Sequence, residues 1–481
     1  MHMVFRKNAK IWMVGIKGAG MAGLAQILKG LGYRVQGSDT KEKFYTDAIL
    51  KRLGISVLER FSPKNVRGAD FVVASNAYMQ GPRTRDKGSG YGEVREAKRR
   101  SIPVLSYPEA VGELFNNSFG IAVAGTHGKS TTAAMIGVML EKLGADPTAL
   151  IGAEVLNWES NARVTKHSTL STKPYFVLEA DEYKNAFLHY QPNMIVLTNV
   201  EWDHPDVFPS FAKYAWAFKK FIGRLKTRGI IIVPRDNRVA WRVAQQQQHK
   251  VFSFGKHPRS VVRVANITVG PRGTLFSVFF NKKRLGAVTL QLFGEHHAYN
   301  AVAAIACGLA LGYPFLHIKK ALKTFQGTRR RFEILSPHRF VPHTLSPVVI
   351  DDYAHHPTEI AVTIRAARQA FPRRPVHILF QPHTFSRTQA LFRDFVKALH
   401  LADRVYILTT YGSARERKGK IGSRELAKTL RAPHFATHQE AAQVLRNILP
   451  QNAILLAVGA GDQWRVAQKL LNMMQGTRRK R

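Results

Sequence analysis

Cysteine is almost absent from this sequence of 481 residues, and long apolar runs are missing from it. The single cysteine, Cys307, excludes a disulfide within the chain and favours a reducing compartment. No stretch approaches about 18 uninterrupted apolar residues, so we expect no transmembrane helix. The first residues also lack the apolar core and the cleavage site of a signal peptide. These absences predict a cytoplasmic protein.

Acidic residues are scarce beside basic ones, because 32 Asp and Glu residues face 72 Lys and Arg residues and the formal net charge is +40. Such a charge attracts polyanions, including nucleotides, nucleic acids and anionic lipids. The basic residues are scattered, however, and they are not interleaved with aromatic residues as in a platform for single strands. We therefore interpret most of the charge as a solvated basic surface. Nucleic acid is expected to bind only non-specifically, if at all.

The length of the chain exceeds what one hydrophobic core usually organises. Three blocks of alternating strands and helices occur, and they open with apolar strands near residues 11–14, 120–123 and 348–350. The pattern predicts an α/β fold of three domains over residues 1–118, 119–327 and 328–481. Alternating strands and helices indicate parallel sheets, whose ligands lie at the carboxyl ends of the strands.

A glycine loop follows the first predicted strand and opens a helix. Gly18, Gly20 and Gly23 have the spacing of a dinucleotide fingerprint, and Asp39 lies about 20 residues further on. Glycines in such a loop let the backbone approach a pyrophosphate at the N-terminus of the helix. By itself the pattern favours a dinucleotide such as NAD, with a bare tight turn as the alternative.

A second glycine loop again lies between a strand and a helix. It is shorter than the usual P-loop, because Val123 stands where the first glycine would be. Its backbone N–H groups can still surround phosphates, Lys129 can offset the charge of the transferred group, and the Ser130 hydroxyl can bind magnesium. We predict a phosphate-binding site that comprises Gly125, Thr126, His127, Gly128, Lys129, Ser130 and Thr131.

Acidic residues end two further predicted strands. Glu179, Asp181 and Glu182 end one of them, and Asp203 and His204 end the other. Because parallel strands end at the same edge of a sheet, these groups converge where nucleotide-bound magnesium would lie. A solvated acidic rim is the alternative, but the neighbouring P-loop favours a metal site.

Six motifs occur in an order that resembles the Mur ligase family. They are the glycine fingerprint, the shortened P-loop, the run from Glu179 to Tyr183, the pair Asp203-His204, the run Arg330-Arg331-Phe332, and residues 351–357 with the sequence Asp-Asp-Tyr-Ala-His-His-Pro. The resemblance covers nearly the whole chain. It implies a Rossmann-like first domain that holds a UDP-sugar, a P-loop second domain that binds ATP, and a Rossmann-like third domain that admits an amino acid. The first glycine loop would then serve a UDP pyrophosphate, which replaces the interpretation as an NAD site.

Within the family, the chain is most similar to members that join L-alanine to the lactyl carboxylate of UDP-N-acetylmuramate in peptidoglycan precursor synthesis. The resemblance implies ATP as co-substrate, Mg²⁺ as cofactor, an acyl phosphate intermediate, and release of ADP and phosphate. In the implied mechanism the carboxylate would attack the γ-phosphate of ATP, and the amine would then displace phosphate.

The resemblance also assigns residues to each ligand. The UDP-sugar would contact Gly18, Ala19, Gly20, Asp39, Ser75 and Asn76. ATP would contact the second glycine loop together with Asn300, Arg331 and Asp352. The metal ligands would be Ser130, Glu179 and His204, and the amino acid would meet His383 and Arg387. Catalytic roles would belong to Lys129, Glu179, His204, Arg331 and Asp352.

Two places depart from the family pattern or match it loosely. His297 stands where the pattern His-Asn-x-x-Asn has its first asparagine, which affects the contacts expected for the nucleotide base. Lys219 and Lys220 lie near the place of a lysine that some relatives carbamylate as a metal-bridging group. An exposed pair of helical lysines is the alternative interpretation.

Two other functions stay open. A recycling ligase attaches a murein tripeptide to the same UDP-sugar, although residues 381–388 and the short passage 183–189 favour the alanine-adding type. A basic nucleic-acid-binding module with vestigial nucleotide sites is the second, although Lys129, Glu179, His204 and Asp352 are all intact. The sequence does not distinguish alanine from serine or glycine, and it does not determine the oligomeric state.

Overall fold

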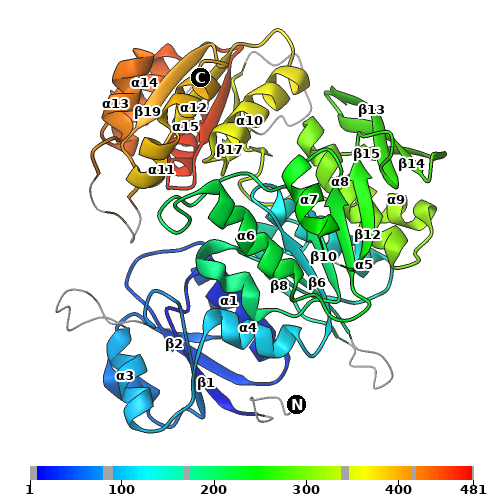
Figure 1. Ribbon diagram of the computed structural model, residues 1–481. Coiled ribbons are helices and arrows are strands. Elements are labelled where there is room, and N and C mark those ends of the chain that lie inside the picture. Colours follow the sequence, from blue (N-terminus) through cyan, green and yellow to red (C-terminus); the bar gives the residue numbers. More distant parts are fainter. Residues whose placement is uncertain are drawn as a thin grey trace.

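Three parallel or mixed sheets, each flanked by helices, follow one another along the chain in the computed structural model (Figure 1). The structure describes residues 8–79, 90–166, 174–246, 248–336, 346–412, 416 and 419–478. The first domain lies at the bottom of Figure 1, the central domain lies in the middle, and the third domain lies at the top. Among the described helices, none combines the length and the apolar character needed to cross a membrane.

The first domain contains a fully parallel sheet with the strand order β3-β2-β1-β4-β5. Its buried strand β4 reads Phe-Val-Val-Ala, which suits a strand covered on both faces. The elements are β1 (Lys10–Val14), α1 (Ala19–Gly30), β2 (Arg34–Ser38), α2 (Thr46–Arg52), β3 (Ser56–Leu58), η1 (Pro63–Val66), β4 (Phe71–Ala74), α3 (Tyr91–Arg99), β5 (Val104–Ser106) and α4 (Tyr107–Phe115).

The central domain contains a mixed ten-stranded sheet with the order β15-β14-β13-β12-β11-β10-β6-β9-β7-β8. Strands β14 and β15 form an antiparallel pair at one edge of this sheet. The elements are β6 (Phe119–Ala124), α5 (Lys129–Lys142), β7 (Thr148–Val155), β8 (Ser160–Arg163), β9 (Tyr175–Glu179), η2 (Tyr183–His189), β10 (Met194–Leu197), α6 (Phe211–Ile222), β11 (Ile230–Pro234), α7 (Arg238–Gln245), β12 (Lys250–Gly255), β13 (Val262–Gly270), β14 (Gly273–Phe280), β15 (Lys283–Leu290), α8 (Glu295–Ala310) and α9 (Phe315–Lys323).

The third domain contains a sheet with the order β16-β17-β21-β18-β19-β20, in which only the short edge strand β16 pairs antiparallel. The elements are β16 (Glu333–Ile334), β17 (Val348–Asp352), α10 (Pro357–Ala370), β18 (Val376–Phe380), α11 (Phe385–Ala390), α12 (Phe392–Leu399), β19 (Arg404–Leu408), α13 (Ser423–Leu430), β20 (His434–Phe435), α14 (His438–Ile448), β21 (Ile454–Val458) and α15 (Trp464–Arg478).

Strand β6 divides the core of the central domain into two layers. Ile121 and Val123 point into the cluster that α5 and α8 cover. Ala122 and Ala124 point to the opposite side, into a cluster that continues through α6 into the first domain. Since successive side chains of a strand alternate between its faces, one strand serves both layers. The first and central domains therefore share one continuous apolar core.

Buried polar contacts reinforce this junction. The Gln26 Nε2 atom of α1 donates to Asn161 Oδ1 at 2.9 Å, and Ser160 Oγ donates to Gln26 Oε1 at 2.6 Å. Asn161 Nδ2 also donates to the Ala19 carbonyl at 2.7 Å, at the start of α1. These bonds fix the N-terminus of α1 against the central domain.

Candidate active site

The phosphate loop forms the turn between β6 and α5, as predicted. Gly125 and Gly128 have positive φ values of 136° and 78°, which favour glycine. A side chain at Gly125 would also collide with Thr198, and one at Gly128 would collide with Asn300. The loop can therefore keep this tight shape only with glycine at both positions, and Asn300 reaches the loop because Gly128 has no side chain.

Lys129 points back across the loop and forms an ion pair there with Glu182. Its Nζ atom donates to the Gly125 carbonyl at 2.6 Å and to Glu182 Oε2 at 2.9 Å. Glu182 is fully buried, and the Tyr214 hydroxyl donates to its other oxygen at 2.9 Å. Burial opposes the charge of Lys129, but Glu182 and Asp181 outweigh burial and raise its pKa. Lys129 thus stays charged beside the carbonyl groups of its own loop.

The predicted metal ligands divide into two groups. Ser130 Oγ donates to Glu179 Oε1 at 2.8 Å, so these two lie together at the start of α5. His204 instead lies with Asp181 and Glu182, and one ligand atom from each of these three residues lies within 4.8 Å of the others. Hydroxyl and carboxylate oxygens are the donors that Mg²⁺ prefers, and both groups supply them. The donor set therefore fits magnesium near Lys129.

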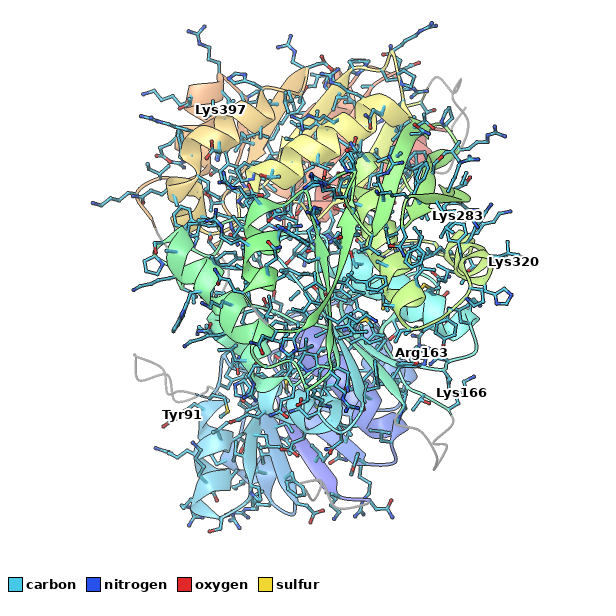
Figure 2. All side chains as sticks on the ribbon, turned by 45° about the vertical axis from the view of Figure 1, so that its right-hand side comes forward. Tyr91, Arg163, Lys166, Lys283, Lys320 and Lys397 are labelled. Carbon is cyan, nitrogen blue, oxygen red and sulfur yellow. The ribbon has the colours of Figure 1, made fainter. Side chains whose placement is uncertain are left out.

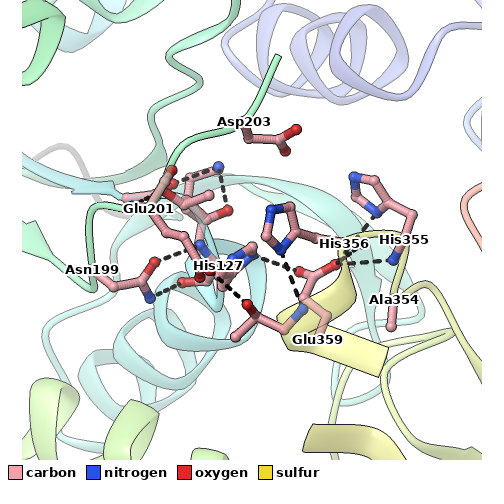
Figure 3. A network of polar contacts seen from close by, with 12 residues as sticks. His127, Asn199, Glu201, Asp203, Ala354, His355, His356 and Glu359 are labelled. Carbon is pink, nitrogen blue, oxygen red and sulfur yellow. Dashed lines mark hydrogen bonds and ion pairs between the residues drawn. The ribbon is translucent and has the colours of Figure 1, made fainter. Parts of the chain in front are cut away.

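His127 lies between a carboxylate of its own domain, Glu201, and one of the third domain, Glu359 (Figure 3). Its Nε2 atom lies 3.0 Å from Glu201 Oε2, and its Nδ1 atom lies 3.2 Å from Glu359 Oε1 on α10. Burial opposes a charge on the ring, but Glu359 and Glu201 outweigh it and raise the pKa of His127 to about 9. Thr358 adds a hydrogen bond of 2.6 Å to Glu201 across the same interface. A charged His127 thus holds α10 against the phosphate loop.

A cavity of about 530 Å³ extends from the phosphate loop between the central and third domains. Asn300 lines it on the central side, and Arg331 and Asp352 line it on the side of the third domain. All three are residues that the family resemblance assigns to ATP. Arg331 lies 3.9 Å from Glu359, so it also belongs to the charged interface. Burial raises the pKa of Asp352 to about 6, although the charge of Arg331 and two backbone N–H groups oppose this shift.

Two histidines at the start of α8, the partly buried His296 and the buried His297, line the same cavity. The Nδ1 atom of His296 and both ring nitrogens of His297 have no hydrogen-bond partner among the described residues. Burial lowers the pKa of His296 to about 4 and that of His297 well below its usual value, so both rings are neutral. Buried polar atoms without partners are costly, and a ligand can supply the missing bonds.

Arg387 lies inside the interface between the central and third domains. Its Nε atom donates to Asp203 Oδ1 at 2.8 Å, and both side chains are only 5% exposed. A second nitrogen lies 3.4 Å from Asp203 Oδ2, which makes the pair bidentate. The guanidinium also lies 3.2 Å from His383 Nδ1 and 3.4 Å from His204 Nδ1. The structure therefore brings the predicted amino-acid site and the predicted metal site together around Arg387.

The predicted UDP-sugar residues gather at the carboxyl edge of the first sheet. Gly18, Ala19 and Gly20 begin α1 after β1, Asp39 follows β2, and Ser75 and Asn76 follow β4. Asp39 is held in place, since its Oδ2 atom accepts the Lys17 N–H at 2.7 Å and its Oδ1 atom accepts the Thr40 N–H at 2.8 Å. This edge lies at the point where the strand order reverses between β1 and β4, which is a typical ligand site.

Comparisons with known proteins agree over nearly the whole chain. Family profiles described as "Mur ligase family, catalytic domain", "Mur ligase middle domain" and "Mur ligase, glutamate ligase domain" match residues 10–119, 123–308 and 330–461. The chain is 37% identical to the UDP-N-acetylmuramate–L-alanine ligase of Desulfitobacterium hafniense, with 96% of this chain and 99% of the relative covered. The chain belongs to the Mur ligase family.

Other relatives and solved structures extend this likeness. The UDP-N-acetylmuramate–L-alanine ligase of Aquifex aeolicus is 34% identical, with 96% of each chain covered. The structure of the UDP-N-acetylmuramate-alanine ligase of Thermotoga maritima is similar with a TM-score of 0.77 at 26% identity, covering 98% of this chain and 100% of that one. A murein peptide ligase of Psychrobacter arcticus shares the fold at 22% identity, with a TM-score of 0.71 and coverage of 96% and 98%. The predicted family and its three-domain α/β fold are confirmed.

Sequence reasoning missed two residues that organise this Mur ligase site. Glu359 bonds His127 and lies near Arg331, and its place three residues after His356 at the start of α10 is a capping position that could have drawn attention to it. Tyr214 bonds Glu182, but on the apolar face of α6 it has the pattern of an ordinary core residue. Lys219 and Lys220 are exposed on α6, which agrees with the interpretation as a helical lysine pair.

The raised pKa of His127 predicts a pH-dependent contact between two domains of this Mur ligase. A folded-state pKa of about 9, above the ordinary 6.5, means that the contact is complete below about pH 6.5 and is lost as pH rises through 9. Small-angle X-ray scattering should show the ligand-free protein expanding between pH 7 and pH 10. His127→Gln should abolish this pH dependence, whereas His317→Gln on the exposed face of α9 should retain it. A wild-type protein that stays equally compact at pH 10 would contradict the role of His127.

Because the ring nitrogens of His297 have no hydrogen-bond partner among the described residues, we expect that replacing this histidine stabilises the ligand-free protein and weakens nucleotide binding. His297→Leu should raise the Tm of the ligand-free Mur ligase, because it removes unpaired buried polar atoms that cost about 1–3 kcal/mol each. The same change should weaken ADP binding severalfold, which calorimetry can measure, and His297→Asn should weaken it less. Unchanged ADP affinity in His297→Leu would show that the ring does not contact the nucleotide.

Proposed function

We propose that this chain uses ATP to join L-alanine to the lactyl carboxylate of UDP-N-acetylmuramate and releases ADP and phosphate. The observation that carries the proposal is the meeting of the phosphate loop, the acidic strand ends and the third domain around Lys129. The alanine-ligase names of relatives that cover 96% of this chain support the choice of substrates.

The first chemical step is phosphoryl transfer, in which an oxygen of the lactyl carboxylate attacks the γ-phosphate and ADP leaves. Backbone N–H groups of residues 125–131 and the N-terminus of α5 surround the phosphates. Lys129 exchanges Glu182 and its own loop carbonyls for phosphate oxygens, since a doubly charged phosphate attracts the ammonium group more strongly. When bound, Mg²⁺ neutralises phosphate charge, and Ser130 and Glu179 on one side and Asp181, Glu182 and His204 on the other would hold it.

In the second step the amine of alanine attacks the acyl phosphate, and phosphate leaves from the tetrahedral intermediate. The third domain supplies Arg331 and Asp352 on the wall of the cavity, opposite Asn300 and the histidines of α8. Arg331 can balance the charge of the leaving phosphate, since its guanidinium lies near the phosphate loop beside Glu359. The reaction thus needs the third domain to be closed, because each side of the cavity comes from a different domain.

The alternatives have less support. A murein peptide ligase shares the fold, but the alanine ligase of Thermotoga maritima is structurally more similar, with TM-scores of 0.71 and 0.77 respectively. The intact pairing of Lys129 with Glu182, which Tyr214 also contacts, favours a functional nucleotide site over a nucleic-acid-binding module with a vestigial one.

Substrate choice can be tested by ADP release in the presence of UDP-N-acetylmuramate. L-Alanine should give the highest kcat/KM in a panel with L-serine, glycine and murein tripeptide. Lys129→Ala should lower kcat by roughly a hundredfold or more, because the loop loses the ammonium group that would pair with the γ-phosphate, while UDP-N-acetylmuramate still binds. Lys142→Ala at the far end of α5 is the matched control and should be fully active. Faster turnover with the tripeptide would favour the recycling ligase, and an active Lys129→Ala would refute the assignment of the loop.

Arg387 can be tested for its predicted contact with the alanine carboxylate. Arg387→Ala should raise the KM for alanine roughly tenfold to a hundredfold, as expected when a charge-assisted hydrogen bond is lost, and leave the KM values for ATP and UDP-N-acetylmuramate nearly unchanged. Arg387→Lys should restore only part of the affinity, and Arg393→Ala on exposed α12 should have no effect. Equal losses for all three substrates would instead mean that Arg387 acts only as a clamp on Asp203.

A further inference from the structure

Acidic residues are nearly absent from one part of the chain. Between Asp206 and Glu295 the only acidic residue is Asp236, while seventeen lysines and arginines occur there. This segment includes α6 and α7, which contact each other on one side of the central sheet. The two anionic substrates of the proposed reaction do not explain why this segment has so few acidic residues, because most of the proposed site residues lie elsewhere in the chain.

A groove of about 490 Å³ runs between α6 and α7. Its lining residues recur at helical spacing, and its floor is made of small or aliphatic side chains such as Ala215, Val239 and Val243. Phe211 and Trp216 border it and are 42% and 56% exposed, which is unusual for such large apolar side chains. The groove shares no lining residue with the cavity at the phosphate loop.

Cations surround this apolar floor on both helices. Lys219 lines the groove from α6, and Arg238 and Arg242 line it from α7. Cations project from other elements as well, as Lys283, Lys320 and Lys397 show in Figure 2. What distinguishes the groove is therefore the combination of charge with an apolar floor and exposed aromatic rings, and not the charge alone.

The shape and charge select one kind of occupant. A bilayer surface cannot reach apolar atoms on the floor of a groove, and a second copy of a chain with charge +40 is repelled. A stacked nucleic-acid base has little access, because the Lys220 Nζ atom lies 3.5 Å from the centroid of the Trp216 ring and covers one face. Two neighbouring helices can receive a third helix between them, and acidic side chains on its flanks would meet the cations.

We propose that the groove between α6 and α7 docks an acidic amphipathic helix of a partner protein. The apolar stripe of the helix would lie on Ala215, Val239 and Val243, and its acidic flanks would pair with Lys219, Arg238 and Arg242. A helix of about three turns matches the length of the 12-residue α6. Because the groove shares no lining residue with the cavity at the phosphate loop, the occupant leaves the active site uncovered.

The test uses a fluorescent 18-residue peptide with leucines on one helical face and glutamates on the others. At 150 mM salt its fluorescence anisotropy should show saturable binding to the full-length protein. A peptide of the same composition, with the leucines scattered around the helix, should bind at least tenfold more weakly. A photo-crosslinker on the leucine face should label α6 and α7.

Variants then locate the contact. Trp216→Ala and the double change Arg238→Glu with Arg242→Glu should each weaken binding at least tenfold without changing ligase turnover. Lys319→Glu with Lys320→Glu on α9 is the matched charge reversal and should change binding less than twofold. The proposal would be overturned if both peptides bound equally well, or if the α9 variant lost as much peptide affinity as the α7 variant. Either result would mean that charge alone attracts the peptide. Trp216-dependent binding to phosphatidylglycerol vesicles or to a thymidine oligonucleotide, without binding of the amphipathic peptide, would also overturn it.

Discussion

The buried charges between the central and third domains are the interaction on which the site depends. His127 lies between Glu201 and Glu359, and Arg387 lies against Asp203. His127–Glu359 and Arg387–Asp203 join residues of the two domains, whereas Glu201 lies in the central domain with His127. Arg387 and Asp203, each only 5% exposed, therefore lack their partners unless the domains meet. A buried charge without a partner is strongly disfavoured, and closure is therefore coupled to the correct arrangement of the residues around the phosphate loop.

The two junctions of the central domain differ in chemistry, and this difference suits their roles. Toward the first domain the junction is a continuous apolar core that includes Leu24, Ala122 and Phe218. Toward the third domain, ion pairs surround a cavity, and the apolar contact of Phe293 with Phe332 and Phe371 lies beside them. Polar interfaces exchange their bonds for bonds to water or ligand more readily than apolar ones. The third domain is thus the one suited to open and close during a reaction cycle.

Lys129 and Glu182 pair with each other in the ligand-free site. The ammonium group is paired with Glu182 at 2.9 Å, and Tyr214 holds that carboxylate from the other side. The polar groups around Lys129 are thereby satisfied within the protein. His297 is different, because its ring nitrogens have no hydrogen-bond partner among the described residues. In the proposed function, the polar groups that would contact the phosphates already have partners before ATP binds. His297, near the expected position of the base, would gain its hydrogen bonds only from the nucleotide.

The sequence by itself determined the strands, the two glycine loops and the order of the motifs. The apolar runs near residues 11–14, 120–123 and 348–350 lie within β1, β6 and β17, because a strand buried on both faces has a pattern that depends on a few consecutive residues. The tertiary structure alone decided the pairs. Glu182 lies with His204 while Glu179 bonds Ser130, and Arg387 meets Asp203 across a domain boundary. The pairing of these charged residues depends on how whole sheets and domains pack. Because the partners lie far apart in the chain, no local sequence pattern predicts that packing.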